Sequence, residues 1–143
     1  MGQQNTGIEV TSFDAADRME SPLGGAAVFR LGYPEDPMKP GIMHVRIAPG
    51  QVSPVHRHKS WTAVIVVEGA IRVGGVLHRK GAVLMIEPNI WYGPLEAEPP
   101  GADILEIHAT QPGAEPIWQE MDDERVRGIN AYLARIGRSS WKE

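Results

Sequence analysis

Two histidines separated by one residue, His56 and His58, are the side chains of this sequence whose type and spacing point most directly to chemistry. In a β-strand, side chains two residues apart lie on the same face, so both imidazoles can face one cavity. Neutral imidazole is the commonest metal ligand in proteins, and two of them form most of a facial site for iron, manganese, nickel or zinc. The pair predicts a divalent metal site that needs further ligands, although two histidines alone do not require that an ion is bound.

Three more histidines and one glutamate are candidates to complete the site. His44 lies on the apolar run before the pair, and His78 lies near a turn, where we expect it to be solvated. Glu106 and His108 lie two residues apart on a later run and therefore share one face of it. If that face is the inward one, His108 is the expected third ligand and Glu106 lies beside it. If the aliphatic face of that run is inward instead, neither residue takes part.

The elements that must position these residues are predicted to be short strands. The chain has 16 glycines and 12 prolines in 143 residues, which favours many turns over long helices. Runs rich in valine and isoleucine recur between the turns, and Gly74-Gly75 is a two-residue hairpin signal. This pattern predicts an all-β protein, an antiparallel sandwich or barrel. The expected strands cover residues 27–33, 42–48, 62–68, 70–73, 76–79, 82–87 and 102–110.

The two ends of the chain differ from this central region. Residues 1–25 are polar and glycine-rich and are expected to form an N-terminal arm, followed by a barrel over residues 26–115. Residues 116–143 are expected to form a C-terminal helical segment, with a helix from about Asp122 to Ile136 that ends at Gly137. The apolar stripe of this helix, which would pack on the barrel or on another subunit, consists of Val126, Ile129, Leu133 and Ile136.

The histidine pair stands in a wider frame of spaced residues. Gly50, five residues, His56-x-His58, three residues, Thr62, six residues and Gly69 follow one another. This arrangement resembles the first motif of the cupin family, which is a glycine, five residues, His-x-His, three or four residues, a glutamate, six residues and a glycine. In this chain Thr62 stands where that motif has its glutamate.

A second frame follows downstream. The second cupin motif is a glycine, five residues, a proline, one residue, a glycine, two residues and a histidine. Counted from Gly81, it places Glu87 at the proline position and Asn89 at the glycine position. Asparagine is the best substitute for glycine where a positive φ is needed, and the proline has moved by one position to Pro88. Tyr92 stands where the motif has its histidine.

The resemblance implies a cupin fold, which is a double-stranded β-helix or jelly-roll barrel, here with a C-terminal α-helix. In metal-binding cupins the ligands are usually the two histidines and the glutamate of the first motif and the histidine of the second. Carried over to this chain, His56 and His58 keep two of these four positions, while Thr62 and Tyr92 replace the other two. Threonine and neutral tyrosine are poor ligands for a divalent ion, so half of the family's ligand set is missing.

Aromatic side chains lie in or beside both motifs. Trp61 precedes Thr62, and Trp91 and Tyr92 are adjacent, so we expect a cavity that binds a small organic molecule, with Trp61 or Trp91 near its mouth. Tyr92 is a candidate proton donor, and Thr62 is expected to line the cavity. Arg46 is a further candidate, because its fork of donors could hold a carboxylate or an enolate.

Three functions are consistent with these residues. The first is a metal-dependent enzyme, in which an ion activates dioxygen or polarises a carbonyl. Both histidines would hold this ion, with one further ligand from Tyr92, His108, Glu106 or His44. For this function the resemblance to small cupins implies a diketone- or polyketide-like substrate. The second is a metal-free isomerase, cyclase or lyase, in which the histidines and Tyr92 act as acid and base. The third is a non-catalytic module that binds a small molecule. The sequence favours the first.

The overall composition argues against several other classes of protein. A net charge of −4 gives no support for a nucleic-acid partner, and the absence of cysteine excludes disulfides and thiolate chemistry. The longest apolar stretch, Ala63 to Val67, is too short to cross a bilayer, and the first residues do not resemble a signal peptide. We therefore expect a soluble, cytoplasmic protein without a membrane partner. A homodimer is expected as well, because exposed sheet edges are a liability that pairing removes.

Overall fold

The structure is a computed structural model that describes residues 7–8, 18–20, 27–31, 38–110, 112–114 and 116–120, and the single residues 124, 127 and 131. The regular elements within these ranges are strands, apart from one short 3₁₀ turn and the three single residues 124, 127 and 131, which are helical, so the prediction of a mainly β protein is confirmed. The elements are β1 (Arg18–Glu20), β2 (Ala27–Leu31), β3 (Gly41–Ile47), β4 (Val52–Ser53), β5 (His56–Arg57), β6 (Thr62–Glu68), β7 (Ala70–Val73), β8 (Val76–Arg79), β9 (Val83–Ile86), β10 (Leu95–Ala97), β11 (Ala102–His108), η1 (Pro112–Ala114) and β12 (Ile117–Trp118).

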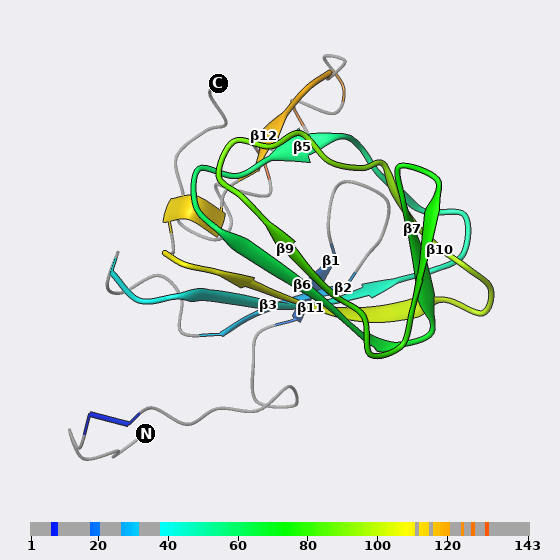
Figure 1. Cartoon of the computed structure of the whole chain (residues 1–143), viewed down its shortest axis with the longest axis horizontal. Helices are drawn as coiled ribbons and strands as arrows, with labels where there is room; N and C mark the ends of the chain where they lie inside the picture. The colour runs from blue at the N-terminus through cyan, green and yellow to red at the C-terminus, as the bar shows by residue number, and fades with distance from the viewer. Residues whose placement is uncertain are drawn as a thin grey trace.

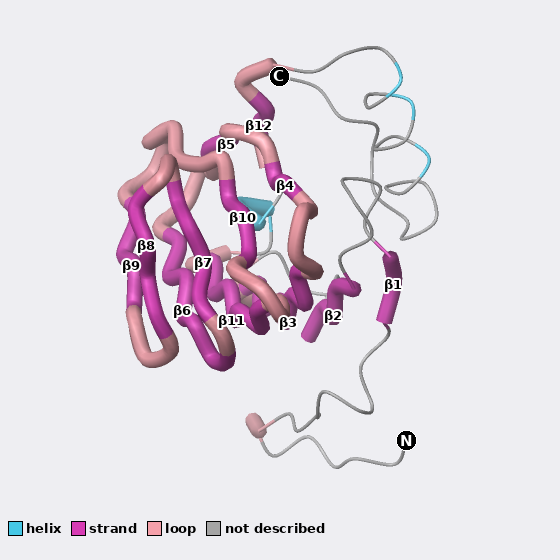
Figure 2. The backbone as a smooth tube through the Cα atoms, turned by 90° about the vertical axis from the view of Figure 1, so that its right-hand side faces the viewer, coloured by secondary structure: helices cyan, strands magenta, loops and turns pink. Residues whose placement is uncertain are grey.

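The strands form three antiparallel sheets around a common interior. The six-stranded sheet has the order β1-β2-β3-β11-β6-β9, and the four-stranded sheet has the order β4-β10-β7-β8. The third sheet is the pair of β12 and β5. In Figure 1 strands β3, β11 and β6 lie below, β7 and β10 lie to the right, and β5 and β12 lie above. Figure 2 shows the same barrel from the side, with β5 and β12 facing β11 and β3 across the interior.

The burial pattern of the central strands shows how the sequence builds a barrel wall. Along β6, Thr62, Val64 and Val66 are buried, while the residues between them are half-buried. Strand β11 alternates in the same way along its full length, from Ala102 to His108. Such alternation is typical of antiparallel strands with one face on the core. The enclosed core is mainly aliphatic, and Ile71, Leu95 and Ile104 are its largest fully buried apolar side chains.

The turns follow the local sequence closely. Val73 pairs with Val76 in the β7–β8 hairpin, and Gly74 and Gly75 between them have φ angles of 58° and 84°. Positive φ at both central residues is what a two-residue turn of type I′ requires. Asn89 has a φ of 65°, the only positive value of a non-glycine residue in the described part of the chain. This confirms that Asn89 replaces a glycine in conformation as well as in the motif.

The expected ends of the chain are only partly described. Within the expected C-terminal helix, Asp122 to Ile136, only residues 124, 127 and 131 are described, so the rest of that helix lies outside the described residues. The expected N-terminal arm, residues 1–25, is described only at residues 7–8 and at β1, which pairs with β2. Strand β12 lies inside the range expected to form the helical segment and pairs with β5. In the described part of the chain there is no helix with the length and hydrophobicity needed to span a bilayer.

Candidate functional site

The site begins at strand β5, which the first motif supplies. His56 lies on this strand and His58 follows directly after it, and each side chain is buried with a residue exposure of 4%. The two imidazole rings have their centroids 5.1 Å apart and stand nearly perpendicular, at 84°. The structure therefore brings both histidines of the first motif into the interior of the barrel, next to each other.

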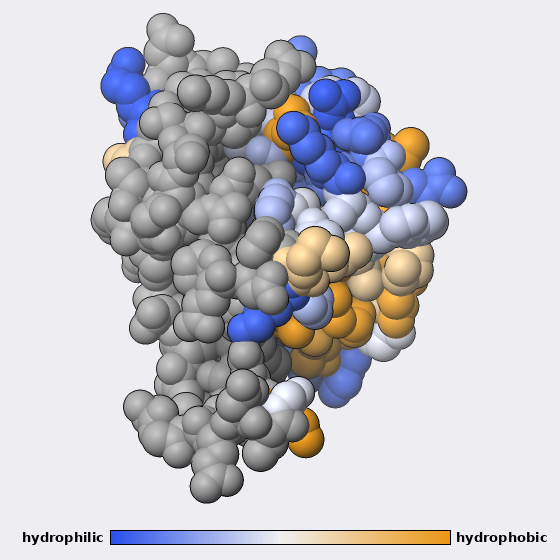
Figure 3. Space-filling view, turned by 90° about the vertical axis from the view of Figure 1, so that its left-hand side faces the viewer, coloured by the Kyte–Doolittle hydropathy of each residue, from blue (hydrophilic) through white to orange (hydrophobic). Residues whose placement is uncertain are grey.

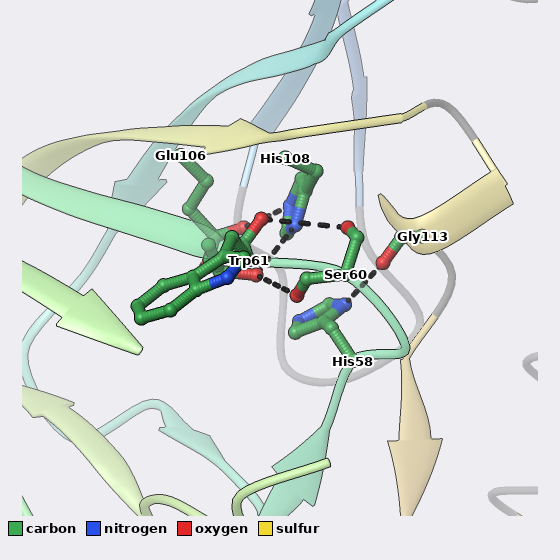
Figure 4. A network of polar contacts seen from close by, with 7 residues as sticks. His58, Ser60, Trp61, Glu106, His108 and Gly113 are labelled. Carbon is green, nitrogen blue, oxygen red and sulfur yellow. Dashed lines mark hydrogen bonds and ion pairs between the residues drawn. The ribbon is translucent and has the colours of Figure 1, made fainter. Parts of the chain in front are cut away.

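Two more polar residues enter the same interior from β11. Glu106 and His108 are buried, at 7% and 0% exposure, because they lie on the inward face of that strand. The His108 ring centroid lies 4.4 Å from that of His58. On the other side, His108 Nε2 lies 3.9 Å from Glu106 Oε2. Figure 4 shows these residues meeting, with His58 coming from one wall and Glu106 and His108 from the wall opposite.

Backbone carbonyls hold the two motif histidines by their Nδ1 atoms. His56 Nδ1 lies 2.8 Å from the carbonyl oxygen of Pro54, and His58 Nδ1 lies 3.0 Å from that of Gly113 in η1. A carbonyl oxygen only accepts, so each Nδ1 must carry the proton and donate it. In the neutral imidazole the lone pair is then on Nε2. A backbone acceptor for the second ring nitrogen is the usual way in which proteins orient a metal-binding histidine.

Thr62 holds the third histidine in the same manner. Its hydroxyl oxygen lies 3.0 Å from His108 Nδ1, directly across the β6–β11 pairing. The same hydroxyl donates to the carbonyl oxygen of Ser60 at 3.4 Å, so it accepts from His108 Nδ1. His108 Nε2 is thereby turned towards Glu106 and the interior. Thr62, at the glutamate position of the family motif, is thus a residue that orients an imidazole.

Aromatic side chains close the site around His56. Tyr92 pairs with His56 in an isolated antiparallel bridge, and Trp118 on β12 pairs with His56 from the other side. Their rings lie 4.6 Å and 4.9 Å from the His56 ring, between centroids. Tyr92 Oη and Trp118 Nε1 are both buried and have no hydrogen-bond partner in the described part of the chain. The same is true of Nε2 in His58 and His108.

The electrostatics of the site follow from this burial. Burial lowers the pKa of His56, and it lowers the pKa of His58 to about 3, with the neighbouring imidazoles acting in the same direction. Burial by itself would raise the pKa of Glu106, but the adjacent His108 lowers it to about 2. Burial and the charge of Glu106 raise the pKa of Tyr92 well above its ordinary value. At neutral pH the site therefore holds two neutral imidazoles, a protonated phenol and a buried carboxylate.

This donor set fits a divalent cation by its chemistry. Three imidazoles and one carboxylate are the ligand types that iron, manganese, nickel and zinc accept in proteins. Among the described residues, Nε2 of His58 and Nε2 of His108 have no hydrogen-bond partner. A buried carboxylate also needs a compensating positive charge. Within the described residues, no group of three or more histidine, aspartate or glutamate side chains is already arranged as a metal site. A cation would therefore have to draw the side chains of His56, His58, His108 and Glu106 together.

Several residues named from the sequence lie outside this cluster. Arg46 points away from the interior, and its Nε lies 3.7 Å from Asp103 Oδ1. His44 lies on the same outer face, with Nε2 3.6 Å from Asp103 Oδ2. Asp103 and both of these residues belong to the face of the sheet opposite Glu106 and His108, because Arg46 pairs with Asp103 across the β3–β11 ladder. The structure thus does not bring Arg46 to the site.

The remaining candidates are more peripheral. His78 is half-buried on β8, in the four-stranded sheet. Trp61 and Trp91 are exposed, at 46% and 37%, and the Arg57 guanidinium lies 4.6 Å above the Trp91 ring. Because Arg57 and His56 point to opposite faces of β5, Trp91 covers the outside of that strand.

Sequence reasoning missed two contributors to the site, Trp118 and Gly113. Trp118 lies on a strand of two residues, too short for any alternating pattern, and Gly113 acts through its backbone carbonyl. The absent side chain of Gly113 is also needed, because a Cβ there would lie 2.0 Å from Ser60 Oγ. Pro112-Gly113 is a typical turn pair, but nothing in the sequence indicates that this turn meets His58.

Solved structures provide a comparison with this architecture. An RmlC-like cupin protein from Ralstonia eutropha superposes with a TM-score of 0.64, at 17% identity, over 94% of this chain and 92% of the other. The protein has a cupin fold. The polyketide cyclase RemF from Streptomyces resistomycificus shares this cupin fold with a TM-score of 0.66, at 12% identity, over 82% of this chain and 89% of its own. A candidate acetylacetone dioxygenase from Methylibium petroleiphilum superposes with a TM-score of 0.63, at 16% identity, over 82% of this chain and 90% of its own.

Other proteins contain the cupin fold as one part of a longer chain. The chain spans 51% of a protein in the Rhodobacter sphaeroides complex of SigE with the anti-sigma ChrR, at a TM-score of 0.57, 17% identity and 68% coverage of this chain. It spans 37% of Bacillus subtilis oxalate decarboxylase, at a TM-score of 0.60, 16% identity and 91% coverage of this chain. No family model matches the sequence, and no curated protein matches it. The similarity therefore lies in the fold.

Proposed function

We propose that this protein is a cupin-type enzyme that transforms a small organic molecule with a divalent metal ion. The observation that carries the proposal is the cluster of three buried imidazoles and one buried carboxylate, in which each imidazole is held by its Nδ1 atom. His56, His58 and His108 would hold the ion, with Glu106 as the fourth ligand. When bound, the ion would supply Lewis-acid polarisation of a carbonyl or, if it is iron, activation of dioxygen.

The proposed ligand set differs from the family's set by a relocation. The family places its third and fourth ligands where this chain has Thr62 and Tyr92. Here Glu106 and His108 on β11 supply a carboxylate and an imidazole of the same chemical types, from the strand that pairs with β6 next to Thr62. The chain's own residues would bind and orient the ligand, keep Nε2 of His56 and His58 free of protons, and exclude water from the buried interior.

The class of substrate is inferred from the surroundings of the cluster and from proteins of the same fold. RemF is a polyketide cyclase and the Methylibium protein a candidate acetylacetone dioxygenase, so small oxygenated molecules are handled by this fold. The Mn(II) centres of Bacillus subtilis oxalate decarboxylase show that the fold also holds metal ions. For this chain we propose a diketone- or polyketide-like substrate, because aromatic rings and unpartnered donors surround the imidazoles.

A second candidate function is a metal-free isomerase, cyclase or lyase. The observation that favours it is the His108–Glu106 pair, 3.9 Å apart and buried, which could hold and transfer a proton without an ion. In this case Tyr92, which burial keeps protonated, would be the acid.

Metal-dependent turnover separates the two candidates. The protein is assayed on a panel of enolisable diketones, with loss of the enol absorbance and oxygen uptake as readouts. The metal enzyme loses activity after treatment with a chelator and regains it when one of Fe²⁺, Mn²⁺, Ni²⁺ or Zn²⁺ is added. Activity that the chelator leaves unchanged contradicts the metal enzyme and supports the acid–base mechanism.

We also propose that the protein is a homodimer. The outer face of β6, β9 and β11 is aliphatic across all three strands, since it carries Ala63, Ile65, Val67, Val83, Met85, Leu105 and Ile107. An antiparallel sheet that faces water normally has polar residues on that side. The charged Asp103 of this face lies near the start of β11 and contacts Arg46 and His44 of β3, so a second copy could pack on the apolar part without like-charge repulsion. Figure 3 shows an apolar area on the lower part of the described surface.

A further inference from the structure

Tyr92 and Trp118 form a row with His56 across three neighbouring segments. Each is paired directly with His56, Tyr92 through a bridge with N···O distances of 3.0 Å and 3.1 Å and Trp118 through the β12–β5 ladder. Residues directly opposite each other in an antiparallel pair project on the same side. The centroid distances of 4.6 Å and 4.9 Å to the His56 ring agree with this geometry. Both aromatic side chains therefore flank the imidazole on the inward side.

The row carries two hydrogen-bond donors that the described residues do not satisfy. Tyr92 and Trp118 are buried, at 9% and 5% exposure, and neither Tyr92 Oη nor Trp118 Nε1 has a partner within the described residues. An indole N–H can only donate, and a phenol is protonated at neutral pH. A buried donor without an acceptor destabilises the folded protein, because it has lost its hydrogen bond to water. Two such donors beside one imidazole of a polar interior therefore need an acceptor that the described residues do not provide.

The charge of the surroundings limits what that acceptor can be. Glu106 is a buried carboxylate in the same interior. In the metal-free site a free carboxylate on the ligand would be repelled by it, because like charges interact strongly when they are shielded from water. A carbonyl or enol oxygen has the lone pairs that both donors need and carries no full charge of its own. Such an oxygen fits the row better than an acid group.

We infer that Tyr92 Oη and Trp118 Nε1 bind a carbonyl or enol oxygen of the ligand beside His56. This deepens the proposed function and rests on it for the role of the ligand as a substrate. The two donors would fix which carbonyl group lies next to His56 and would stabilise negative charge that develops on its oxygen during reaction. Tyr92 and Trp118 would then decide which small molecules are accepted.

The test uses N-methylacetamide, a small uncharged carbonyl compound that does not chelate metal ions, as the probe for the full-length protein with and without Zn²⁺. The indole N–H resonance of Trp118, assigned with Trp118→Phe, is followed by nitrogen-15 correlation spectroscopy. We expect it to move downfield and to saturate as the probe is added, since the N–H gains an acceptor. The indole resonance of the exposed Trp61 should not move.

Binding constants of variants complete the test. Tyr92→Phe and Trp118→Phe keep an aromatic ring next to His56, and each should weaken probe binding about tenfold, the loss of roughly one hydrogen bond. Trp61→Phe is the matched control and should bind like the wild type. An unmoved Trp118 resonance, equal affinities of all variants, or no binding of the probe at millimolar concentration would overturn the inference. Failure to bind Zn²⁺ contradicts the proposed metal enzyme and not this inference. In that case the titration of the metal-free protein still tests whether Tyr92 and Trp118 bind a carbonyl oxygen.

Discussion

At the level of single residues, the site depends on how each imidazole is held. Pro54 and Gly113 provide carbonyl acceptors for His56 and His58, and Thr62 provides a hydroxyl for His108. Each contact fixes the ring and leaves Nε2 towards the interior. Burial keeps such a histidine neutral in the folded protein, whereas in the unfolded chain it binds a proton at low pH. The free energy of unfolding therefore decreases as the pH falls below the pKa of the unfolded histidine.

The stability of the metal-free protein should therefore fall with pH below about 6.5. The pKa of His58 is lowered from 6.5 to about 3, so the unfolded state binds its proton first as the pH falls. Between about pH 6.5 and about pH 5 this one group removes about 2 kcal/mol of unfolding free energy. Glu106, with its pKa lowered from 4.5 to about 2, adds a loss of the same sign below about pH 4.5.

Urea unfolding at several pH values, with a chelator present, measures this dependence. His58→Asn removes the titrating ring, so its unfolding free energy should change less between pH 6.5 and pH 5 than that of the wild type. His78→Asn, at the half-buried histidine of β8, is the control and should keep the wild-type slope. Equal slopes for the wild type and His58→Asn would show that burial does not hold His58 neutral.

At the level of elements, the site lies where β5, β6, β11 and η1 meet. The turn η1 is held to its surroundings by the Gly113 amide, which donates to Thr110 Oγ1 at 3.2 Å, and by the contact of its carbonyl with His58. There is no room for a side chain at Gly113, because a Cβ would lie 2.4 Å from Ser60 Cβ. The turn and the loop before β6 are therefore packed against each other by backbone and small side chains.

Gly113→Ala should displace η1 and release His58. Loss of a residue that orients a metal ligand typically costs ten- to a hundredfold in affinity, so we expect a decrease of about that size in Zn²⁺ affinity, measured by competition with a chromogenic chelator. Ser60→Gly removes the side chain that the new Cβ would meet, so the double variant should recover most of the affinity. If Gly113→Ala binds Zn²⁺ like the wild type, the carbonyl of Gly113 has no part in positioning His58.

These elements were accessible to sequence reasoning to different degrees. The hairpin at Gly74-Gly75 and the positive φ of Asn89 follow from local chemistry, so both were predictable. The inward face of β11 was not, because its two faces each carry aliphatic residues and the sequence period alone cannot rank them. The burial of Glu106 and His108 depends on tertiary structure, because it follows from the pairing of β11 with β3 on one side and β6 on the other. Trp118 lay beyond prediction because its strand has two residues.

At the level of the whole molecule, the largely aliphatic outer face of β6, β9 and β11 takes no part in the proposed site, which lies in the interior of the barrel. Val83 and Met85 on the outermost of these strands are 59% and 62% exposed. Strand β9 is the last strand of the six-stranded sheet within the described residues, so this face ends at a sheet edge. Exposed apolar faces of this kind mark protein–protein contacts more often than free surface.

Val83→Glu should therefore disrupt the proposed homodimer. A charge placed on each copy of this face would be buried without a partner in the interface, which costs several kcal/mol. Val76→Glu is the matched control, because Val76 is also a valine with 59% exposure but lies on β8 in the other sheet. Sedimentation velocity at micromolar concentration should show a dimer for the wild type and Val76→Glu and a monomer for Val83→Glu. A monomeric wild type, or a dimeric Val83→Glu, contradicts the proposed interface.

The central claim is that Glu106 and His108 replace the third and fourth ligands of the family, and titration with Co²⁺ tests it most directly. The visible spectrum of Co²⁺ reports both its binding and its ligand field. We expect one Co²⁺ per chain for the wild type, affinity at least about a hundredfold lower for His108→Ala and Glu106→Gln, and nearly unchanged affinity for Tyr92→Phe and for the control His78→Ala. A wild-type protein that binds no Co²⁺, or a His108→Ala variant that binds it as tightly as the wild type, would contradict the relocated site.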